Sequence, residues 1–252
     1  MTTASVLEIC IDSVASAIES QKGGADRVEL CDNLFEGGTT PSEGTIRITR
    51  ERIDIGLQVI IRPRGGDFVY SEDEFLIMES DIRRAKELGA NGVVFGILEP
   101  DGGIDMRRNG RLREIAYPMN ATFHRAFDVS RGAFESLDRI VELGFDRILT
   151  SGQAVSVWEG IHVLRSLVDA AGDRIIVMPG GDLREDTVGR CREETGAREF
   201  HMRLEHEVAS ASAVRRDIPM GGTLRPPELT IHVTDPGRVG RARRAVDTEP
   251  SR

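Results

Sequence analysis

The sequence of 252 residues contains only three cysteines, an odd number that is too small for a disulfide-stabilised fold. This usage is typical of a reducing compartment, and we expect a cytoplasmic protein. The chain has no run of about 18 apolar residues and its start lacks the features of a signal peptide, so we expect no membrane segment. The formal net charge of −9 argues against nucleic acid as a partner, because non-specific binding needs a basic surface.

The most regular feature that the chain does contain is a joint between a helix and a strand that occurs four times. Each joint begins with a glycine, 52 to 65 residues after the previous one, and runs into a short apolar strand; these glycines are Gly24, Gly89, Gly144 and Gly196. Glycine readily adopts the left-handed conformation that ends a helix. The repeat therefore predicts alternating strands and helices, with functional groups at the opposite, C-terminal ends of the strands.

Eight strands can be assigned from apolar runs between turn signals, with a helix after each of the first seven. The predicted strands are residues 7–11, 27–31, 58–62, 92–97, 121–127, 147–150, 175–178 and 199–202. The predicted helices are residues 13–23, 42–52, 71–89, 105–116, 131–144, 156–172 and 184–196. Eight alternations favour a (β/α)8 TIM-type barrel in a single domain, with an open doubly wound sheet as the alternative. No Gly-x-Gly-x-x-Gly follows the first strand, so we expect no nucleotide cofactor.

The last fifty residues have a different composition. We expect one helix over residues 203–217. The remainder is rich in glycine, proline and arginine, so we expect it to form a loop and a tail. We therefore expect the barrel domain over residues 1–218 and an irregular C-terminal extension over residues 219–252, with disorder from Asp247 onward.

Polar side chains collect near the ends of the predicted strands. Residues two apart in a strand share a face, so Glu8 lies with Cys10, and Glu29 with Cys31. The remaining candidates are Arg62, Arg64, Asp67, His124, Arg125, Asp128, Ser151, Gln153, Gly180, Gly181 and His201. In a barrel these groups converge on the C-terminal face, where active sites lie. The alternative is a structural network of buried ion pairs between the glutamates and the arginines.

Six segments, in this order along the chain, resemble the CutC family of copper homeostasis proteins. They are residues 7–10, 24–31, 37–42, 61–68, 123–128 and 149–153, and the resemblance extends over roughly residues 6–236. It implies a cytoplasmic (β/α)8 barrel, often a homo-oligomer, with a role in copper handling. It also implies that Cys10 and Cys31, which stand at the matching positions, bind Cu(I).

The cysteine pair suits this chemistry, because Cu(I) is a soft ion that selects thiolate ligands. Neighbouring strands lie about 4.8 Å apart, so Cys10 and Cys31 can approach each other at the ends of the first two strands. A nearby Arg62 or Arg64 would favour the thiolates by lowering their pKa. The alternative is that both cysteines are small buried apolar residues.

An enzyme that acts on a small anionic metabolite, phosphorylated or sugar-like, is the competing hypothesis. Glu8, Glu29, Arg62 and His124 are its catalytic candidates, since burial can adjust their pKa values. The substrate-binding candidates are Arg64, Asp67, Arg125, Asp128, Ser151, Gln153, Gly180, Gly181 and His201. Lyase, isomerase and hydrolase reactions all remain open.

A divalent metal site is a third alternative. Glu8, Glu29, His124 and His201 are suitable ligand types, but no two of them form a compact motif in the sequence.

Overall fold

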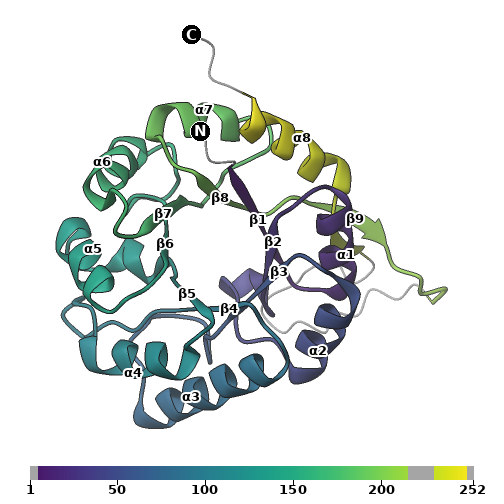
Figure 1. The fold of residues 1–252 in the computed structure, drawn as a ribbon. Coiled ribbons are helices and arrows are strands. Elements are labelled where there is room, and N and C mark those ends of the chain that lie inside the picture. Colours follow the sequence, from purple (N-terminus) through teal and green to yellow (C-terminus); the bar gives the residue numbers. More distant parts are fainter. Residues whose placement is uncertain (1–4, 215–229, 249–252) are drawn as a thin grey trace.

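The computed structural model describes residues 5–214 and 230–248, and its centre is a ring of eight parallel strands (Figure 1). The strands are β1 (Val6–Ile11), β2 (Arg27–Leu30), β3 (Gly56–Ile60), β4 (Gly92–Phe95), β5 (Asn120–Phe123), β6 (Arg147–Thr150), β7 (Ile176–Pro179) and β8 (Glu199–Met202). Their order in the sheet is β7-β6-β5-β4-β3-β2-β1-β8. A bridge between Gly180 and His201 joins the two edge strands. The barrel is therefore nearly closed, and the predicted (β/α)8 fold is confirmed.

Helices surround the strands on the outside of this ring (Figure 1). They are α1 (Val14–Lys22), α2 (Glu43–Arg52), α3 (Glu72–Glu87), α4 (Met106–Ala116), α5 (Ala133–Glu142), α6 (Ile161–Ala171) and α7 (Val188–Thr195). Four of them begin at a side chain that accepts a backbone N–H of the first turn, namely at Ser13, Ser42, Ser71 and Asp105. Across the described residues, none of the helices has the length and apolarity needed to cross a bilayer.

The four glycine joints have the conformation that the sequence predicts. Gly24, Gly89, Gly144 and Gly196 all have positive φ angles, between +71° and +90°. The aspartates of two joints also bind the neighbouring strand: Asp26 accepts the backbone N–H of Leu7, and Asp146 accepts that of Ala121, both at 2.7 Å. The joints at Asp26 and Asp146 therefore hold the N-terminal ends of strands β1 and β5.

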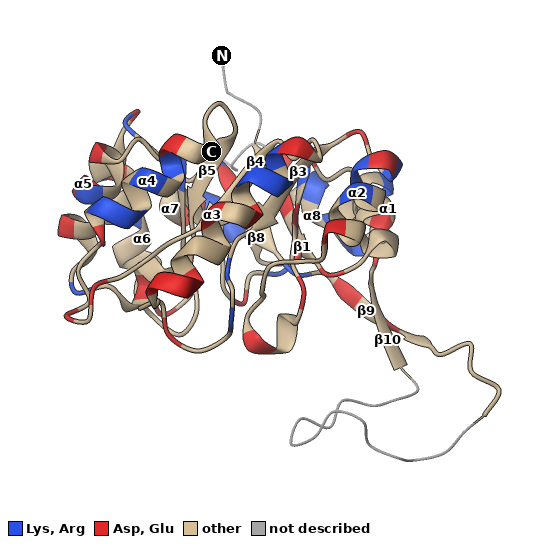
Figure 2. Ribbon diagram, turned by 90° about the horizontal axis from the view of Figure 1, so that it is seen from below, with Lys and Arg blue, Asp and Glu red and all other residues tan. Residues whose placement is uncertain are grey.

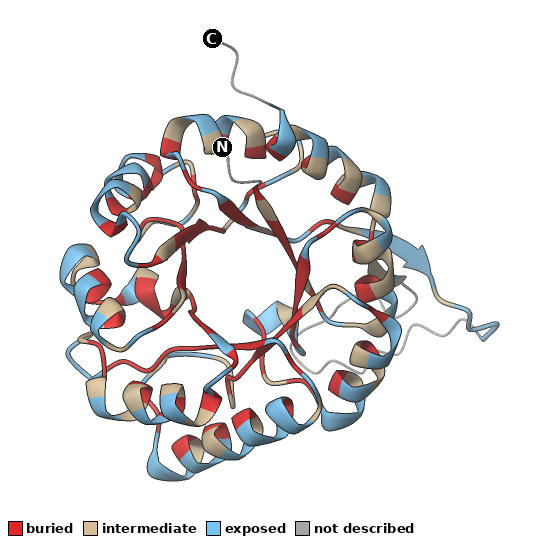
Figure 3. Cartoon of the chain, viewed as in Figure 1, coloured by how far each residue is buried: buried red, intermediate tan, exposed pale blue. Residues whose placement is uncertain are grey.

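The interior of the barrel is charged at its N-terminal end. Arg27 donates from Nε to Glu8 Oε2 at 2.5 Å and forms a second ion pair with Glu199. Arg147 Nε lies 3.0 Å from the same Glu199 carboxylate. These four buried residues, which we call the floor cluster, lie inside the ring of strands, most of whose residues are buried (Figure 3). Part of the predicted structural ion network is thus present, although its arginines are Arg27 and Arg147.

The chain after β8 differs from the prediction. The helix predicted over residues 203–217 is wrong, because Glu205–Ala209 forms strand β9, which pairs antiparallel with β10 (Thr230–Thr234). A local sequence pattern does not reveal that pairing, since the partner lies more than 20 residues away. The two strands project from the rim of the barrel (Figure 2).

The predicted loop and tail also contain a helix, α8 (Pro236–Asp247), which packs between α1 and α7. Asp247, where we expected disorder to begin, is the last residue of this helix. Residues 249–252 and the predicted boundary at residue 218 lie outside the described residues. Helix α8 therefore occupies the remaining position in the outer ring (Figure 1).

The close contact between α8 and α1 predicts a stability effect. Val239 is fully buried, and a Cβ added to Gly23 at the end of α1 would lie 2.4 Å from Val239 Cβ. We expect Val239→Ala to lower the free energy of unfolding by about 2 kcal/mol, through lost burial and the cavity left behind. Val208→Ala, the same change at a position 38% exposed on β9, should stay within about 0.5 kcal/mol. Chemical denaturation measures both, and equal values would show that α8 is not part of the core.

Candidate functional site

A cavity of about 350 Å³ opens at the C-terminal ends of the strands. Strands β1, β2 and β8 contribute Cys10, Glu29 and His201, and the loops after β5 contribute His124, Arg125, Asp128 and Val129; the remaining lining residues are Gly37, Ile60, Arg62, Phe68 and Leu149. Seven of the fifteen predicted site residues therefore line one cavity, at the face of the barrel where active sites are expected.

The two predicted metal ligands lie together beside this cavity: Cys10 lines it, and Cys31 is buried next to Cys10. Cys10 Sγ and Cys31 Sγ are 3.9 Å apart, and Cys31 Sγ is 3.8 Å from Glu29 Oε2. Strands β1 and β2 pair in register, with Cys10 opposite Glu29, so Cys31 follows two residues further on the same face. Gly38, with φ of +90°, brings its loop so close that a Cβ there would lie 3.2 Å from Cys31 Sγ. Backbone pairing and this loop together hold the sulfur atoms in place.

Cys10, Glu29 and Cys31 are the one group in the described chain whose ligand atoms are close enough to share a metal ion, all lying within 4.8 Å of one another. His124 belongs to no such group among the described residues. The third alternative, a divalent metal held by both histidines and both glutamates, therefore has no support from the geometry.

A chain of charged groups connects the cysteines to the floor cluster. Glu8, paired to Arg27 below, receives His201 Nδ1 at 2.7 Å on its other oxygen, and His201 Nε2 lies 3.6 Å from Glu29 Oε2. Burial alone would raise the pKa of Glu8, but Arg27 and His201 outweigh it and hold that pKa well below its usual range. Burial alone would lower the pKa of His201, but Cys10 and the two carboxylates raise it well above its usual range.

The pKa values of Glu29 and of the two cysteines also differ from their usual ranges. Burial raises the pKa of Glu29 to about 8, against the opposing charge of His201. The hydrogen bond from Cys31 lowers the pKa of Cys10 to about 5, with further help from His201 and Arg203. Contact with Cys10 and burial raise the pKa of Cys31 well above its usual range. At neutral pH the pair therefore consists of one thiolate and one thiol, beside a protonated carboxyl group.

Arg62 and Arg64 do not have the predicted influence on the cysteines, whose cationic neighbours are His201 and Arg203. Arg62 is buried and donates to the carbonyl oxygens of Glu36, Gly38 and Gly66 at 2.8–2.9 Å. These contacts tie the loops after β2 and β3 together. The carbonyl oxygens in turn satisfy the hydrogen-bonding groups of the buried guanidinium.

Arg64 and Asp67 lie outside the cavity lining. Arg64 binds Glu74 Oε1 at 2.6 Å and Asp67 Oδ1 at 3.1 Å, and it stacks over the ring of Tyr70. Their predicted role in substrate binding has no support from this position.

His124 follows β5 at the point where we expected the strand to continue to residue 127. The strand ends at Phe123, because the 3₁₀ turn η2 (Arg125–Val129) begins there and His124 Nδ1 accepts the N–H of Ala126 at 3.3 Å. Burial, together with the charge of Arg62, lowers the pKa of His124 to about 3, so its ring is neutral. Among the residues that the structure describes, no carboxylate pairs with His124, so it lacks there the partner that activates a catalytic histidine.

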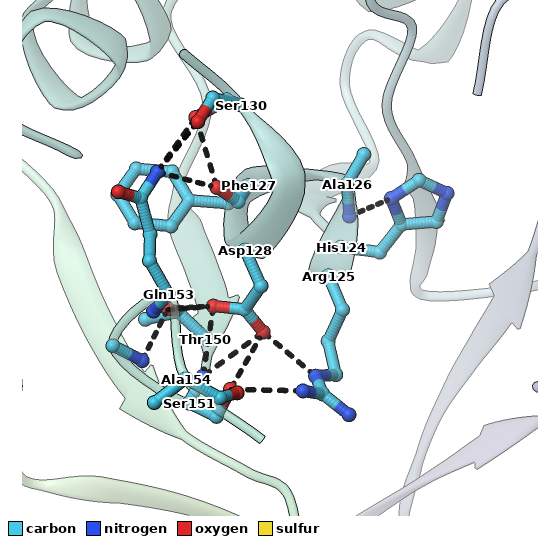
Figure 4. Close-up of polar contacts among 11 residues, drawn as sticks. His124, Arg125, Ala126, Phe127, Asp128, Ser130, Thr150, Ser151, Gln153 and Ala154 are labelled. Atoms are coloured by element: carbon cyan, nitrogen blue, oxygen red, sulfur yellow. Dashed lines mark hydrogen bonds and ion pairs between the residues drawn. The ribbon is translucent and has the colours of Figure 1, made fainter. Parts of the chain in front are cut away.

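A second polar cluster lies across the cavity, where the loops after β5 and β6 meet (Figure 4). Asp128 accepts Arg125 Nε at 2.7 Å and the backbone N–H groups of Ser151 and Gln153 at 3.0–3.1 Å. Arg125 also donates to Ser151 Oγ at 2.8 Å. Gly181 lies against Arg125, since an added Cβ there would be 3.4 Å from Arg125 Cζ. Five predicted binding residues are therefore brought together, namely Arg125, Asp128, Ser151, Gln153 and Gly181. Gly180 adjoins His201.

The sequence analysis missed Arg27, Arg147 and Glu199 of the floor cluster. A signal for two of them was present in the repeated joints, because Asp26-Arg27 and Asp146-Arg147 occupy equivalent positions. In both, the aspartate binds the preceding strand and the arginine enters the barrel toward Glu199. The repeated Asp-Arg pair could therefore have predicted the two buried arginines as well as the starts of the strands.

The charge chain predicts an unusually acidic thiol. Alkylation of Cys10 by iodoacetamide should follow its thiolate and fall off below about pH 5, the pKa that Cys31 and His201 impose. His201→Asn should move this midpoint upward by more than one pH unit, since it removes the adjacent cation. His162→Asn, at an exposed position on α6, should leave it unchanged. Mass spectrometry of metal-free protein follows the labelling, and a midpoint near 8.5 in the parent protein would contradict the geometry.

The comparison with known proteins agrees with this arrangement. Residues 5–205 match the model of the CutC family. The human copper homeostasis protein cutC homolog is 43% identical over 235 residues, covering 93% of this chain and 86% of the relative. A family protein CutC of Parabacteroides distasonis is 47% identical over 238 residues, covering 93% and 97%.

Solved structures give the same result. A CutC structure from Streptococcus agalactiae superposes with a TM-score of 0.75 at 38% identity, covering 78% of this chain and 97% of that one. N-(5'-phosphoribosyl)anthranilate isomerase of Pyrococcus furiosus, at 14% identity and a TM-score of 0.57 over 96% and 98%, shows likeness in fold alone. With its barrel, its paired cysteines and these similarities, the chain belongs to the CutC family of copper homeostasis proteins.

Proposed function

We propose that this protein binds Cu(I) between Cys10 and Cys31. The observation that carries the proposal is the 3.9 Å separation of the two sulfur atoms, of which that of Cys10 lies in the lining of an open cavity. Metal–thiolate bonds of about 2.3 Å can span sulfur atoms up to about 4.6 Å apart. Thiolate ligands select soft Cu(I) over the harder divalent ions. Glu29 offers a carboxyl oxygen within reach of both sulfurs.

The charges around the pair support binding of a cation. Cys10 supplies a thiolate above about pH 5, so the site already carries one negative charge at neutral pH. Cys31 keeps its proton, because its pKa is raised, and that proton must leave when a metal binds. Copper uptake at this site should therefore release a proton into the cavity, where the His201–Glu29 pair lies.

Removal of the thiols tests the copper site. In an anaerobic competition with a chromophoric chelator, the parent protein should take up one Cu(I) per chain. Cys10→Ser combined with Cys31→Ser should remove this binding, and either single change should weaken it at least about 100-fold, more than loss of a supporting contact costs. Cys191→Ser is the matched control, because Cys191 is buried in α7 and should not affect uptake. Unchanged affinity in the double variant would reject the proposal.

A second candidate function is acid–base catalysis on a small anionic molecule. It is favoured by Glu8 and Glu29, whose pKa values are pushed apart on either side of His201. At neutral pH such a pair places a protonated acid, Glu29, and an ionised carboxylate, Glu8, beside the same histidine. Of the four predicted catalytic residues, these two carry the proposal.

The catalytic candidate requires that Glu29 be protonated at neutral pH. Infrared difference spectra of metal-free protein should show a carboxylic acid band that disappears with a midpoint near pH 8. Glu29→Gln should remove this band, whereas Glu72→Gln, at an exposed position in α3, should retain it. A parent protein with no such band above pH 6 would lack the proposed acid.

We further propose a cytoplasmic location and a homo-oligomeric state. Free Cys10, Cys31 and Cys191 suit a reducing compartment. Exposed apolar side chains at Phe35 and Val155 are available for contacts between copies.

A further inference from the structure

We propose that the same cavity binds a small oxyanion, a carboxylate or a phosphate, through Arg125 on the wall opposite the cysteine pair. The inference concerns the metal-free protein and does not depend on copper binding. It deepens the catalytic candidate by naming the group that would be recognised.

The first observation is the way in which Arg125 is held. Its Nε and Nη2 atoms are occupied by Asp128 and Ser151, while its Nη1 has no hydrogen-bond partner among residues 5–214 and 230–248. The side chain is 42% exposed, and the residue lines the cavity. A guanidinium that is held through two of its nitrogen atoms, with the third nitrogen free, is pre-organised to bind an anion.

The second observation is that Asp128 is a rigid support rather than a competitor for that anion. Its side chain is only 6% exposed, and its two oxygens together accept from Thr150 Oγ1, Ser151 and Gln153 as well as from Arg125 (Figure 4). Gln153, at a positive φ of 57°, is held in turn by the carbonyl oxygens of Phe127 and Ser130. The position of the guanidinium is therefore set by two loops that bind each other.

Glycine at position 181 makes room for this arrangement. Gly181 has a φ of +121°, and a Cβ there would lie 3.2 Å from Ser151 Cβ and 3.4 Å from Arg125 Cζ. A larger residue would push against the guanidinium and its hydroxyl partner. The backbone after β7 thus lies next to the guanidinium of Arg125.

The third observation is an unbalanced positive charge in the same cavity. Arg62 is only 5% exposed and lines the cavity, yet no carboxylate of the described residues pairs with it. Three carbonyl oxygens and the face of Phe68, 5.1 Å from its Cζ, surround it, and its buried Nε has no partner in the described part of the chain. A buried charge is costly unless it is compensated. An anion in the cavity supplies that compensation.

The fourth observation is the size of the cavity. A volume of about 350 Å³ lies in the range of small-molecule sites and exceeds what a single metal ion fills. Apolar side chains of Ile60, Phe68 and Leu149 line it between the two polar walls. This combination suits a small organic molecule with one anionic end, rather than an ion alone.

Titration calorimetry of the metal-free full chain tests the proposal, with inorganic phosphate and malonate as probes at constant ionic strength. At least one probe should bind with one site per chain. Arg125→Gln should weaken that binding at least about tenfold, the loss expected for a charged hydrogen bond. Arg131→Gln is the control, because Arg131 is an exposed arginine of the same face that pairs with Asp101 and Glu135. Arg125→Lys, which keeps the charge, should lose less than Arg125→Gln.

Binding of phosphate alone would identify a phosphate group as the ligand, and binding of malonate alone would identify a carboxylate. The proposal is overturned if neither probe binds at one site, or if Arg125→Gln binds as tightly as Arg131→Gln. Thermal denaturation of each variant tests whether the fold is retained. Because no metal is present, this outcome is separate from the success or failure of the copper site.

Discussion

The interior of this barrel depends on the two contacts that the buried carboxylate of Glu8 makes, with Arg27 and with His201. One of its oxygens accepts Arg27 from the floor cluster, and the other accepts His201 from the mouth. Removing one partner of a buried ion pair leaves an uncompensated charge that costs about 3–5 kcal/mol. Glu8 therefore links the stability of the floor cluster to the protonation of His201 in the cavity.

This linkage explains why the cysteine pair is asymmetric. His201 keeps its proton because it contacts Cys10 and the Glu8 carboxylate, and its charge in turn lowers the pKa of Cys10. Cys31 lies next to Glu29 and the Cys10 sulfur, so its surroundings favour the neutral thiol. Two chemically identical side chains on adjacent strands thus acquire different charges from the groups behind them. A soft cation entering the cavity would meet one ligand that is ready and one that must first lose its proton.

Much of the fold and part of the candidate site could be predicted from the sequence. Repeated glycine joints predicted the barrel, because a backbone conformation is a local property that one residue type reveals. Strand adjacency likewise brought Cys10 and Cys31 together, as predicted, since both lie at equivalent positions of neighbouring units. The partners of each charge were harder to predict: Arg62 was expected beside the glutamates, but it binds backbone carbonyls instead. Pairing of β9 with β10 was missed for the same reason, because it depends on residues distant in sequence.

The two walls of the cavity carry different chemical groups, and this division follows from the elements that build them. Strands β1, β2 and β8 bring Cys10, Glu29 and His201, whereas the loops after β3 and β5 bring Arg62 and Arg125. A site for copper alone needs only the first wall. In the second wall, the buried guanidinium of Arg62 has no carboxylate partner among residues 5–214 and 230–248, and that of Arg125 is held by Asp128, whose oxygens already accept several other donors. This is the arrangement that the oxyanion site proposed at Arg125 requires.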